Sequence, residues 1–149
     1  MKKLLLLLFC LPLFAFAQQL SIKDIRLIPD MDSETFEIFC MKRDYEFYQL
    51  EKGDNRNGLT MQYFDGVTTR YISWYSEYFG AKKAVNYQTT STAELLSIYE
   101  ELKSLGFKLI SREKIESESL RKMYENSNTE EVIIMFLSDD MTEIGYLIE

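Results

Sequence analysis

The chain has 149 residues, a formal net charge of −7 and no histidine. An acidic surface repels nucleic acid and anionic lipid, so neither is expected as a partner. The lack of histidine removes the usual general base and the usual zinc ligand, which excludes most hydrolytic triads and leaves carboxylate pairs, Ser-Lys arrangements and oxygen-only calcium sites.

The first seventeen residues have the order of a secretory signal peptide. Lys2 and Lys3 precede an apolar run over residues 4–14, and a small-x-small cleavage site ends at Ala17. The run is too short to cross a membrane as a helix. We expect cleavage after Ala17, no transmembrane span in the remaining chain, and a periplasmic or extracellular location. Cleavage removes two lysines and no acid, so the formal charge becomes −9.

Residues 18–149 are enough for a single domain with a sizeable core. Cys10 leaves with the signal peptide and Cys40 is then alone, which excludes an intramolecular disulfide although the compartment would permit one. Cys40 is either a small buried side chain of a helix or a thiol that is open to an intermolecular bridge. The pattern favours burial.

Two helices are expected at the start of the domain. Ser21 and Asp24 have the spacing of a capping box, and isoleucines follow at helical spacing. A strand is the competing prediction for this segment. A second helix is expected over residues 33–42, with Asp30 or Asp32 as its cap.

Four strands are expected next, because the pattern becomes alternating from Tyr45 onward. Asp44 occupies the position after the helix where a left-handed residue is wanted, and aspartate tolerates that conformation. The strands are predicted at 45–51, 59–64, 68–76 and 82–90, with a tight turn at Asp65-Gly66.

The second half repeats this order. Residues 91–94 have the spacing of a capping box, and the helix that follows is expected to end at Gly106. Strands are predicted at 107–114, 120–125, 131–138 and 142–148. A shift of 62 positions superposes the halves without a gap and places Cys40 on Leu102. It also gives the pairs Tyr45 with Phe107, Met61 with Met123, Ile72 with Ile134, Trp74 with Phe136 and Ser76 with Ser138.

The repeat predicts an α+β fold. Two tandem α-ββββ repeats, at about 30–90 and 91–149, would form one antiparallel sheet of about eight strands with the helices on one face.

Each half also carries a similar step from helix into strand. The two segments are Lys42-Arg43-Asp44-Tyr45-Glu46-Phe47 and Ser104-Leu105-Gly106-Phe107-Lys108-Leu109. In this organisation the chain resembles the tandem helix-plus-four-strand repeats of beta-lactamase-inhibitor-protein-like folds, and small exported Bacteroidota-type proteins with a K-G-Y-x-F-like step. The first copy departs from that step, with Asp44 in place of glycine. The resemblance implies a fold and an exported location, and it assigns no catalytic residue.

Two groups of polar residues are better explained as solvated surface than as sites. The loop over residues 54–58 has Arg56 at a ligand position and no closing glutamate, so a hairpin loop is favoured over a calcium site. Glu113, Glu116 and Glu118 cluster at a strand end, whereas a glycosidase needs two carboxylates that face one sugar. We therefore expect no catalytic residue, no metal and no cofactor.

Aromatic residues supply the remaining candidate site. In the strand around Trp74 both alternating sets are apolar or aromatic, and residues 132–137 are apolar on both sides too. This predicts that the helix-free face is at least partly covered. The candidate partner-binding residues are Tyr63, Tyr71, Trp74, Tyr75 and Tyr78, because tyrosine and tryptophan are favoured binding anchors. The alternative is that these side chains only stabilise the sheet through cross-strand pairs.

These features lead to three functional hypotheses. The first is an exported, non-enzymatic binding protein that presents its aromatic sheet face to a protein, a peptide or a second copy of itself. The second is a periplasmic inhibitor or immunity-type protein that blocks a basic active site, because negative charge would steer it onto a cationic target. The third is a cell-wall hydrolase that uses carboxylates or a Ser-Lys pair.

Overall fold

The computed structural model describes residues 19–52, 59–66, 70–76, 83–115 and 119–148. The expected signal peptide, the loop over residues 54–58, Glu116, Glu118 and Tyr78 lie outside these ranges. Within them, no helix is both long enough and apolar enough to cross a membrane.

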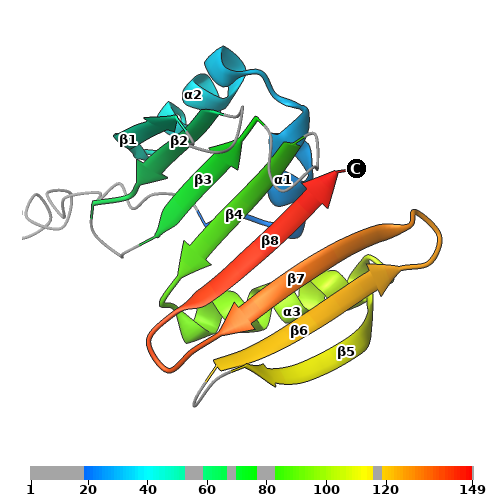
Figure 1. Ribbon diagram of the computed structural model, residues 1–149. Coiled ribbons are helices and arrows are strands. Elements are labelled where there is room, and N and C mark those ends of the chain that lie inside the picture. Colours follow the sequence, from blue (N-terminus) through cyan, green and yellow to red (C-terminus); the bar gives the residue numbers. More distant parts are fainter. Residues whose placement is uncertain (1–18, 53–58, 67–69, 77–82, 116–118, 149) are drawn as a thin grey trace, which may run out of the picture.

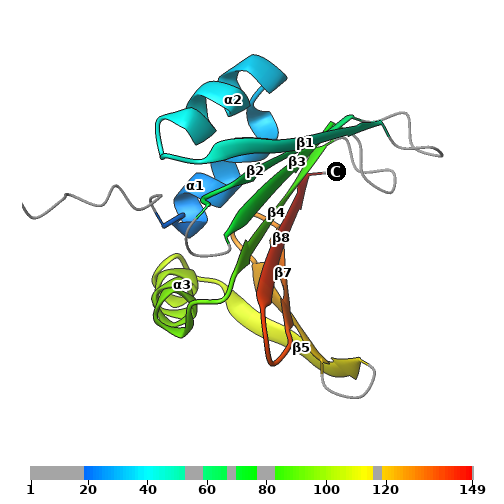
Figure 2. The same cartoon turned by 90° about the vertical axis from the view of Figure 1, so that its left-hand side faces the viewer.

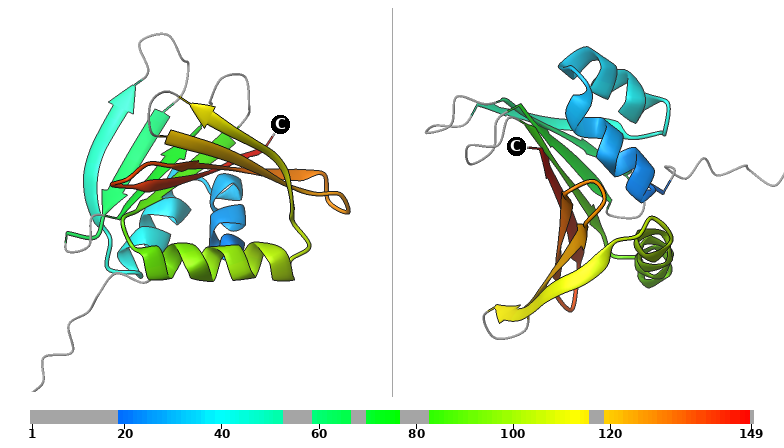
Figure 3. Two further views of the ribbon diagram at one scale, coloured as in Figure 1. Left: turned by 90° about the horizontal axis from the view of Figure 1, so that it is seen from below. Right: turned by 90° about the vertical axis from the view of Figure 1, so that its right-hand side faces the viewer.

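Eight strands form one antiparallel sheet in the order β1-β2-β3-β4-β8-β7-β6-β5 (Figure 1). The helices are α1 (Ile22–Leu27), the 3-10 helix η2 (Ile28–Asp30), α2 (Ser33–Met41) and α3 (Thr92–Ser104). The strands are β1 (Glu46–Lys52), β2 (Leu59–Phe64), β3 (Tyr71–Tyr75), β4 (Lys83–Thr89), β5 (Lys108–Ile115), β6 (Ser119–Asn126), β7 (Glu131–Leu137) and β8 (Thr142–Ile148). All of these helices lie on one face of the twisted sheet (Figures 2 and 3). The predicted α+β architecture is confirmed.

Side-chain caps explain where the helices begin. Ser21 and Asp24 form the predicted capping box, in which each side chain accepts a hydrogen bond from the other residue's backbone N–H. The first segment is therefore a helix, and the competing strand prediction is wrong. Asp32, rather than Asp30, caps α2 by accepting from the Thr35 N–H at 2.8 Å. Satisfied N–H groups at a first turn typically stabilise a helix by about 1 kcal/mol.

Both repeats make the same step from helix into strand. Asp44 and Gly106 have positive φ angles of 61° and 86°. One residue later, the Tyr45 N–H donates to the Cys40 carbonyl at 3.1 Å, and the Phe107 N–H donates to the Leu102 carbonyl at 3.0 Å. The register also shifts at the same place, between Phe47 and Gln49 in the first repeat and between Leu109 and Ser111 in the second. The shift of 62 positions therefore holds through this bulge and along the first strand of each repeat.

The gapless superposition is wrong beyond the first strand of each repeat. Leu50 pairs with Met61, whereas its equivalent Arg112 pairs with Lys122. Met61 therefore corresponds to Lys122, a shift of 61, because the second repeat's first hairpin is one residue shorter.

The same correction moves Trp74 from Phe136 to Met135. Trp74 and Phe136 lie on opposite faces of the sheet, so a one-residue error exchanges buried and exposed positions. The last hairpin is shorter still in the second repeat, and Tyr87 corresponds to Tyr146, 59 positions later.

The core lies between the sheet and its helices. Phe36 of α2 stacks on Trp74 with ring centroids 6.1 Å apart, and it meets Tyr63 edge-on at 5.4 Å. Cys40 is fully buried beside them, and burial raises the pKa of its thiol. The prediction that Cys40 is a buried side chain is confirmed.

Helix α1 lies between α2 and α3 (Figure 2). Its buried isoleucines join the core. The Glu101 carboxylate of α3 accepts from the Ile22 N–H at 2.8 Å, and Arg26 donates two hydrogen bonds of 2.7 Å to Glu131 of β7. The N-terminal segment is therefore held by side chains of the second repeat.

Candidate functional site

The helix-free face carries a cluster of three aromatic rings on β1, β2 and β3. Phe64 and Tyr71 are cross-strand partners whose rings stack with centroids 4.7 Å apart. Tyr48 meets both rings at an angle, with centroids 5.6 Å from Tyr71 and 6.3 Å from Phe64. Tyr48 is 55% exposed, and the other two side chains are half-buried. We call Tyr48, Phe64 and Tyr71 the aromatic cluster. Rings in this arrangement offer a large, rigid contact area at low entropic cost.

A row of hydrogen-bonded polar side chains runs beside the aromatic cluster. The Gln49 amide donates to the Gln62 side-chain oxygen, and Gln62 in turn donates to the Ser73 hydroxyl at 2.9 Å. Farther along the sheet, the Asn86 amide donates to the Glu143 carboxylate at 3.3 Å. These donors and acceptors give the middle of the face a polar surface that is held in place.

Acidic side chains predominate on the helix-free face of the described strands. The cross-strand pairing places on it the acidic residues Glu46, Glu51, Glu113, Glu125 and Glu143, and the basic residues Lys108 and Arg121. Arg121 already donates to Glu113 at 2.5 Å, and this hydrogen bond lowers the pKa of the Glu113 carboxyl. On the described strands, acidic side chains therefore outnumber basic ones across this face, and Glu46 and Glu51 lie on the same half of it as the aromatic cluster. Glu113 lies on a solvated strand in an ion pair, as expected for a charged edge.

The candidate residues from the sequence fall on two different faces. Tyr63 and Trp74 point toward α2 and are only 1% and 4% exposed, so they belong to the core. Tyr71 and Tyr75 lie on the helix-free face, since they alternate with the buried positions of β3. Tyr78 lies outside the described residues. Tyr71 and Tyr75 are therefore on the surface and remain candidates for binding. Tyr63 and Trp74 are buried on the other side of the sheet and cannot belong to a binding surface on the helix-free face.

Two residues of the aromatic cluster, Tyr48 and Phe64, are absent from the sequence-based set. Tyr48 sits at the bulge of β1, so simple alternation assigns the wrong face to the positions around it. A usable signal exists, because the bulge recurs at Ile110, the position 62 residues later. Phe64 is identified by its pairing with Tyr71, which depends on the register of the β2–β3 hairpin.

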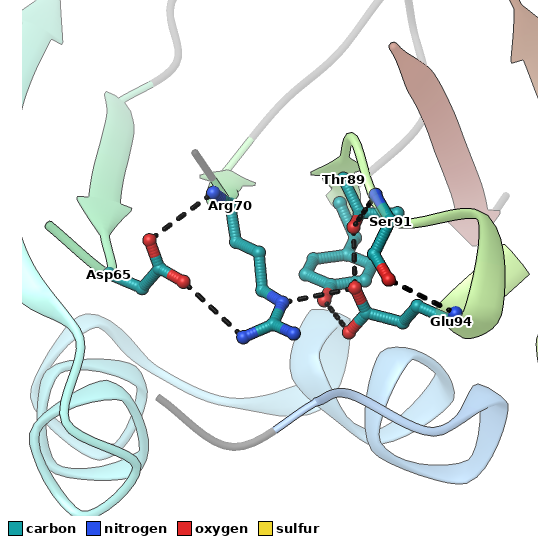
Figure 4. Close-up of polar contacts among 6 residues, drawn as sticks. Asp65, Arg70, Thr89, Ser91 and Glu94 are labelled. Carbon is teal, nitrogen blue, oxygen red and sulfur yellow. Dashed lines mark hydrogen bonds and ion pairs between the residues drawn. The ribbon is translucent and has the colours of Figure 1, made fainter. Parts of the chain in front are cut away.

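A second cluster of titratable groups is buried between the two repeats (Figure 4). Arg70 lies between two carboxylates, with Nη1 3.3 Å from Asp65 Oδ2 and Nε 3.0 Å from Glu94 Oε2. The Asp65 and Glu94 side chains are 0% and 1% exposed. Tyr87 donates its hydroxyl proton to Glu94 at 2.6 Å, and Thr89 donates to the same carboxylate.

This cluster corrects the prediction of a complete capping box at the start of α3. Ser91 accepts from the Glu94 N–H at 3.3 Å, but the Ser91 N–H donates to the Thr89 hydroxyl instead of to Glu94. The Glu94 carboxylate turns inward to Arg70 and Tyr87 (Figure 4). Burial raises the pKa of Tyr87, which keeps the phenol protonated as a donor. With both carboxylates engaged by one guanidinium, the cluster joins the repeats and offers no free general base.

The described residues contain no group of three or more Cys, Asp or Glu side chains that is placed to hold a metal ion. The candidate site is the helix-free face, which carries the aromatic cluster and an excess of carboxylates over cations on its described strands. No protein-family model matches the chain, and no curated protein matches it either.

Proposed function

We propose that the protein is an exported, non-enzymatic binding protein that docks a basic protein or peptide on its helix-free face. The aromatic cluster carries the proposal, because no described helix or strand lies over it (Figure 3). Tyrosine and phenylalanine in such a cluster are suited to anchor a partner, while the polar row beside them supplies hydrogen bonds. Export rests on the signal-peptide pattern of residues 1–17.

The negative charge of the helix-free face indicates what kind of partner it would bind. Glu46 and Glu51 of β1 lie on the same half of the face as the aromatic cluster, and across the whole face the carboxylates of β1, β5, β6 and β8 outnumber the cations of the described strands. A second copy of this chain would bring like charges together, whereas a basic surface would be attracted. A basic protein is therefore the preferred occupant. The same charge supports a second candidate function, an inhibitor or immunity-type protein that blocks a basic active site.

Affinity capture with residues 18–149 tests the proposal. The bait is incubated with envelope and medium fractions of the source organism, in parallel with a Tyr48→Ser/Tyr71→Ser variant. The matched control is Leu27→Ser/Leu96→Ser, which removes two exposed side chains from the helices on the other face. We expect a basic partner that the aromatic variant loses and the control retains.

The outcome also separates the alternatives. Binding that weakens steeply between low and high salt indicates electrostatic attraction, because exposed charges are screened over a Debye length of ~8 Å at physiological ionic strength. Loss of a hydrolase activity in the captured partner would identify an inhibitor. If the aromatic variant keeps the partner, or if the bait captures only itself, the helix-free face is not the docking surface for a basic protein.

A further inference from the structure

A hollow of about 480 Å³ lies between α2 and β1, at the edge of the helix-covered face. It is separate from the aromatic cluster, which lies on the other side of the sheet. The lining combines the apolar surfaces of Met41, Phe47 and Tyr63 with the acidic residues Glu37 and Asp44. Both acidic residues are exposed. Glu46 also borders the hollow, but its pairing with Phe64 places its side chain on the helix-free face.

Tyr63 brings an unused hydrogen-bonding group to the hollow. Its side chain is 1% exposed, and its hydroxyl has no hydrogen-bond partner among the described residues. Buried hydroxyl groups normally have a partner, since leaving one unpaired is costly. Burial, together with the nearby charge of Glu37, raises the pKa of Tyr63 to about 12, so the phenol is protonated and able to donate. A ligand in the hollow would supply the missing acceptor or donor.

The second repeat shows what fits at the equivalent position. Tyr99 stands 62 positions after Glu37, and Tyr124 stands 61 positions after Tyr63, as the corrected register requires. The Tyr99 ring lies 6.2 Å from the Tyr124 ring. Lys122 donates to the Tyr99 hydroxyl at 2.7 Å, with its ammonium nitrogen 4.6 Å from the ring centroid. The second repeat therefore provides its own aromatic ring with an ammonium group beside it.

The first repeat lacks an aromatic ring at the position of Tyr99 and an ammonium group at the position of Lys122, although the Phe47 ring meets Tyr63 edge-on with centroids 5.6 Å apart. Glu37 replaces the aromatic ring, and Met61 replaces the lysine. Both repeats keep the tyrosine, and the hollow beside Tyr63 lacks the second ring and the ammonium group that Tyr99 and Lys122 provide beside Tyr124. The carboxylates around it attract a positive charge, and its lining contains no basic residue to balance them.

We propose that this hollow binds an aromatic side chain with a lysine or arginine beside it, presented by a peptide segment of a partner protein. The aromatic ring would take the place that Tyr99 takes in the second repeat, and the cation would face the carboxylates. A peptide is favoured over a small amine because exposed apolar side chains continue along both elements, with Ile38 of α2 44% exposed and Leu50 of β1 54% exposed. Contiguous exposed apolar surface of this kind commonly marks an interaction site.

An NMR titration tests the proposal with defined probes. Isotope-labelled residues 18–149 are titrated with acetyl-Tyr-Lys-amide and, as the charge control, with acetyl-Tyr-Glu-amide. We expect the basic peptide to shift the backbone amide signals of Met41, Phe47 and Tyr63. We also expect it to bind roughly fivefold tighter than the acidic peptide, the ratio typical of a partly exposed ion pair.

Two variants and a matched control complete the experiment. Glu37→Tyr supplies the ring that the second repeat already has and should abolish binding. Met41→Lys places a cation at an exposed lining position, and it tests the same site if the first variant folds poorly. Glu34→Tyr makes the same exchange at another exposed position of α2, outside the lining, and should leave binding unchanged.

Equal binding of the two peptides, or full binding by both Glu37→Tyr and Met41→Lys, would overturn the proposal. Shifts that map to Phe64 and Tyr71 would also overturn it, while they would support docking on the helix-free face. If the capture experiment finds no basic partner but the basic peptide still binds in the hollow, docking on the helix-free face would be overturned and the hollow would remain supported as a binding site. The two proposals therefore fail separately.

Discussion

Replacing Arg70 with methionine is expected to destabilise the protein strongly. The substitution keeps most of the side-chain volume but removes the guanidinium that lies between the Asp65 and Glu94 carboxylates, at 3.3 Å and 3.0 Å. Both carboxylates are essentially inaccessible to water. Removing one partner from a buried ionic cluster costs ~3–5 kcal/mol, because the remaining charge is left uncompensated. This is a large fraction of the ~5–15 kcal/mol that typically separates folded from unfolded states.

Urea denaturation followed by circular dichroism measures this loss as a change in the free energy of unfolding. Arg121→Met is the matched control, because both side chains of its ion pair with Glu113 are exposed, and exposed ion pairs contribute little to stability. A Glu94→Gln substitution added to Arg70→Met should recover part of the loss, since it removes one uncompensated charge. Equal losses for Arg70→Met and Arg121→Met would refute the assignment of a stabilising role to the buried cluster.

Three further predictions concern single positions. The thiol of Cys40 should react with a disulfide reagent only as fast as the protein unfolds, because the side chain is buried and burial raises its pKa; rapid labelling of the native protein would contradict this. Gly106→Ala should cost ~1 kcal/mol and lower Tm, since Gly106 has a φ of 86°, and an unchanged Tm would argue against that conformation. Burial acts to raise the pKa of Glu131, but hydrogen bonds from neighbouring side chains lower it below 4.5 overall. The stability that this carboxylate contributes is therefore present above about pH 4.5 and lost as pH falls through the lowered pKa, so Glu131→Gln should reduce the acid sensitivity of unfolding.

Local patterns predicted the elements well where the determinants are close in sequence. The box of Ser21 and Asp24 and the left-handed position at Asp44 depend on neighbours within a few residues, and both are found as predicted. Glu94 shows the limit of such reasoning. Its spacing from Ser91 fits a capping box, yet its carboxylate binds Arg70, which lies 24 residues away and outside any local window.

Only part of the candidate site could be predicted from the sequence, because the rest depends on contacts between residues that are distant in the chain. Alternation around Trp74 separates two faces, but it does not say which face the helices cover. Packing of Phe36 on Trp74 decides that question, and it moves Trp74 and Tyr63 into the core. The bulge at Tyr48 and the unequal hairpin lengths then change the phase of the pattern, and no periodicity within a single strand reports them.

The attachment of α1 has a consequence for the order in which the chain can fold. A chain that is synthesised and threaded through a membrane from its N-terminus presents α1 first. The side chains that hold α1 come much later, since the Ile22 N–H binds Glu101 across 79 positions and Arg26 binds Glu131 across 105. Contacts of such long range form slowly and need most of the chain to be present. Helix α1 is synthesised before the residues that hold it, so it is among the last elements to find its partners, and in the exported protein that we propose this delays full compaction until the second repeat has followed.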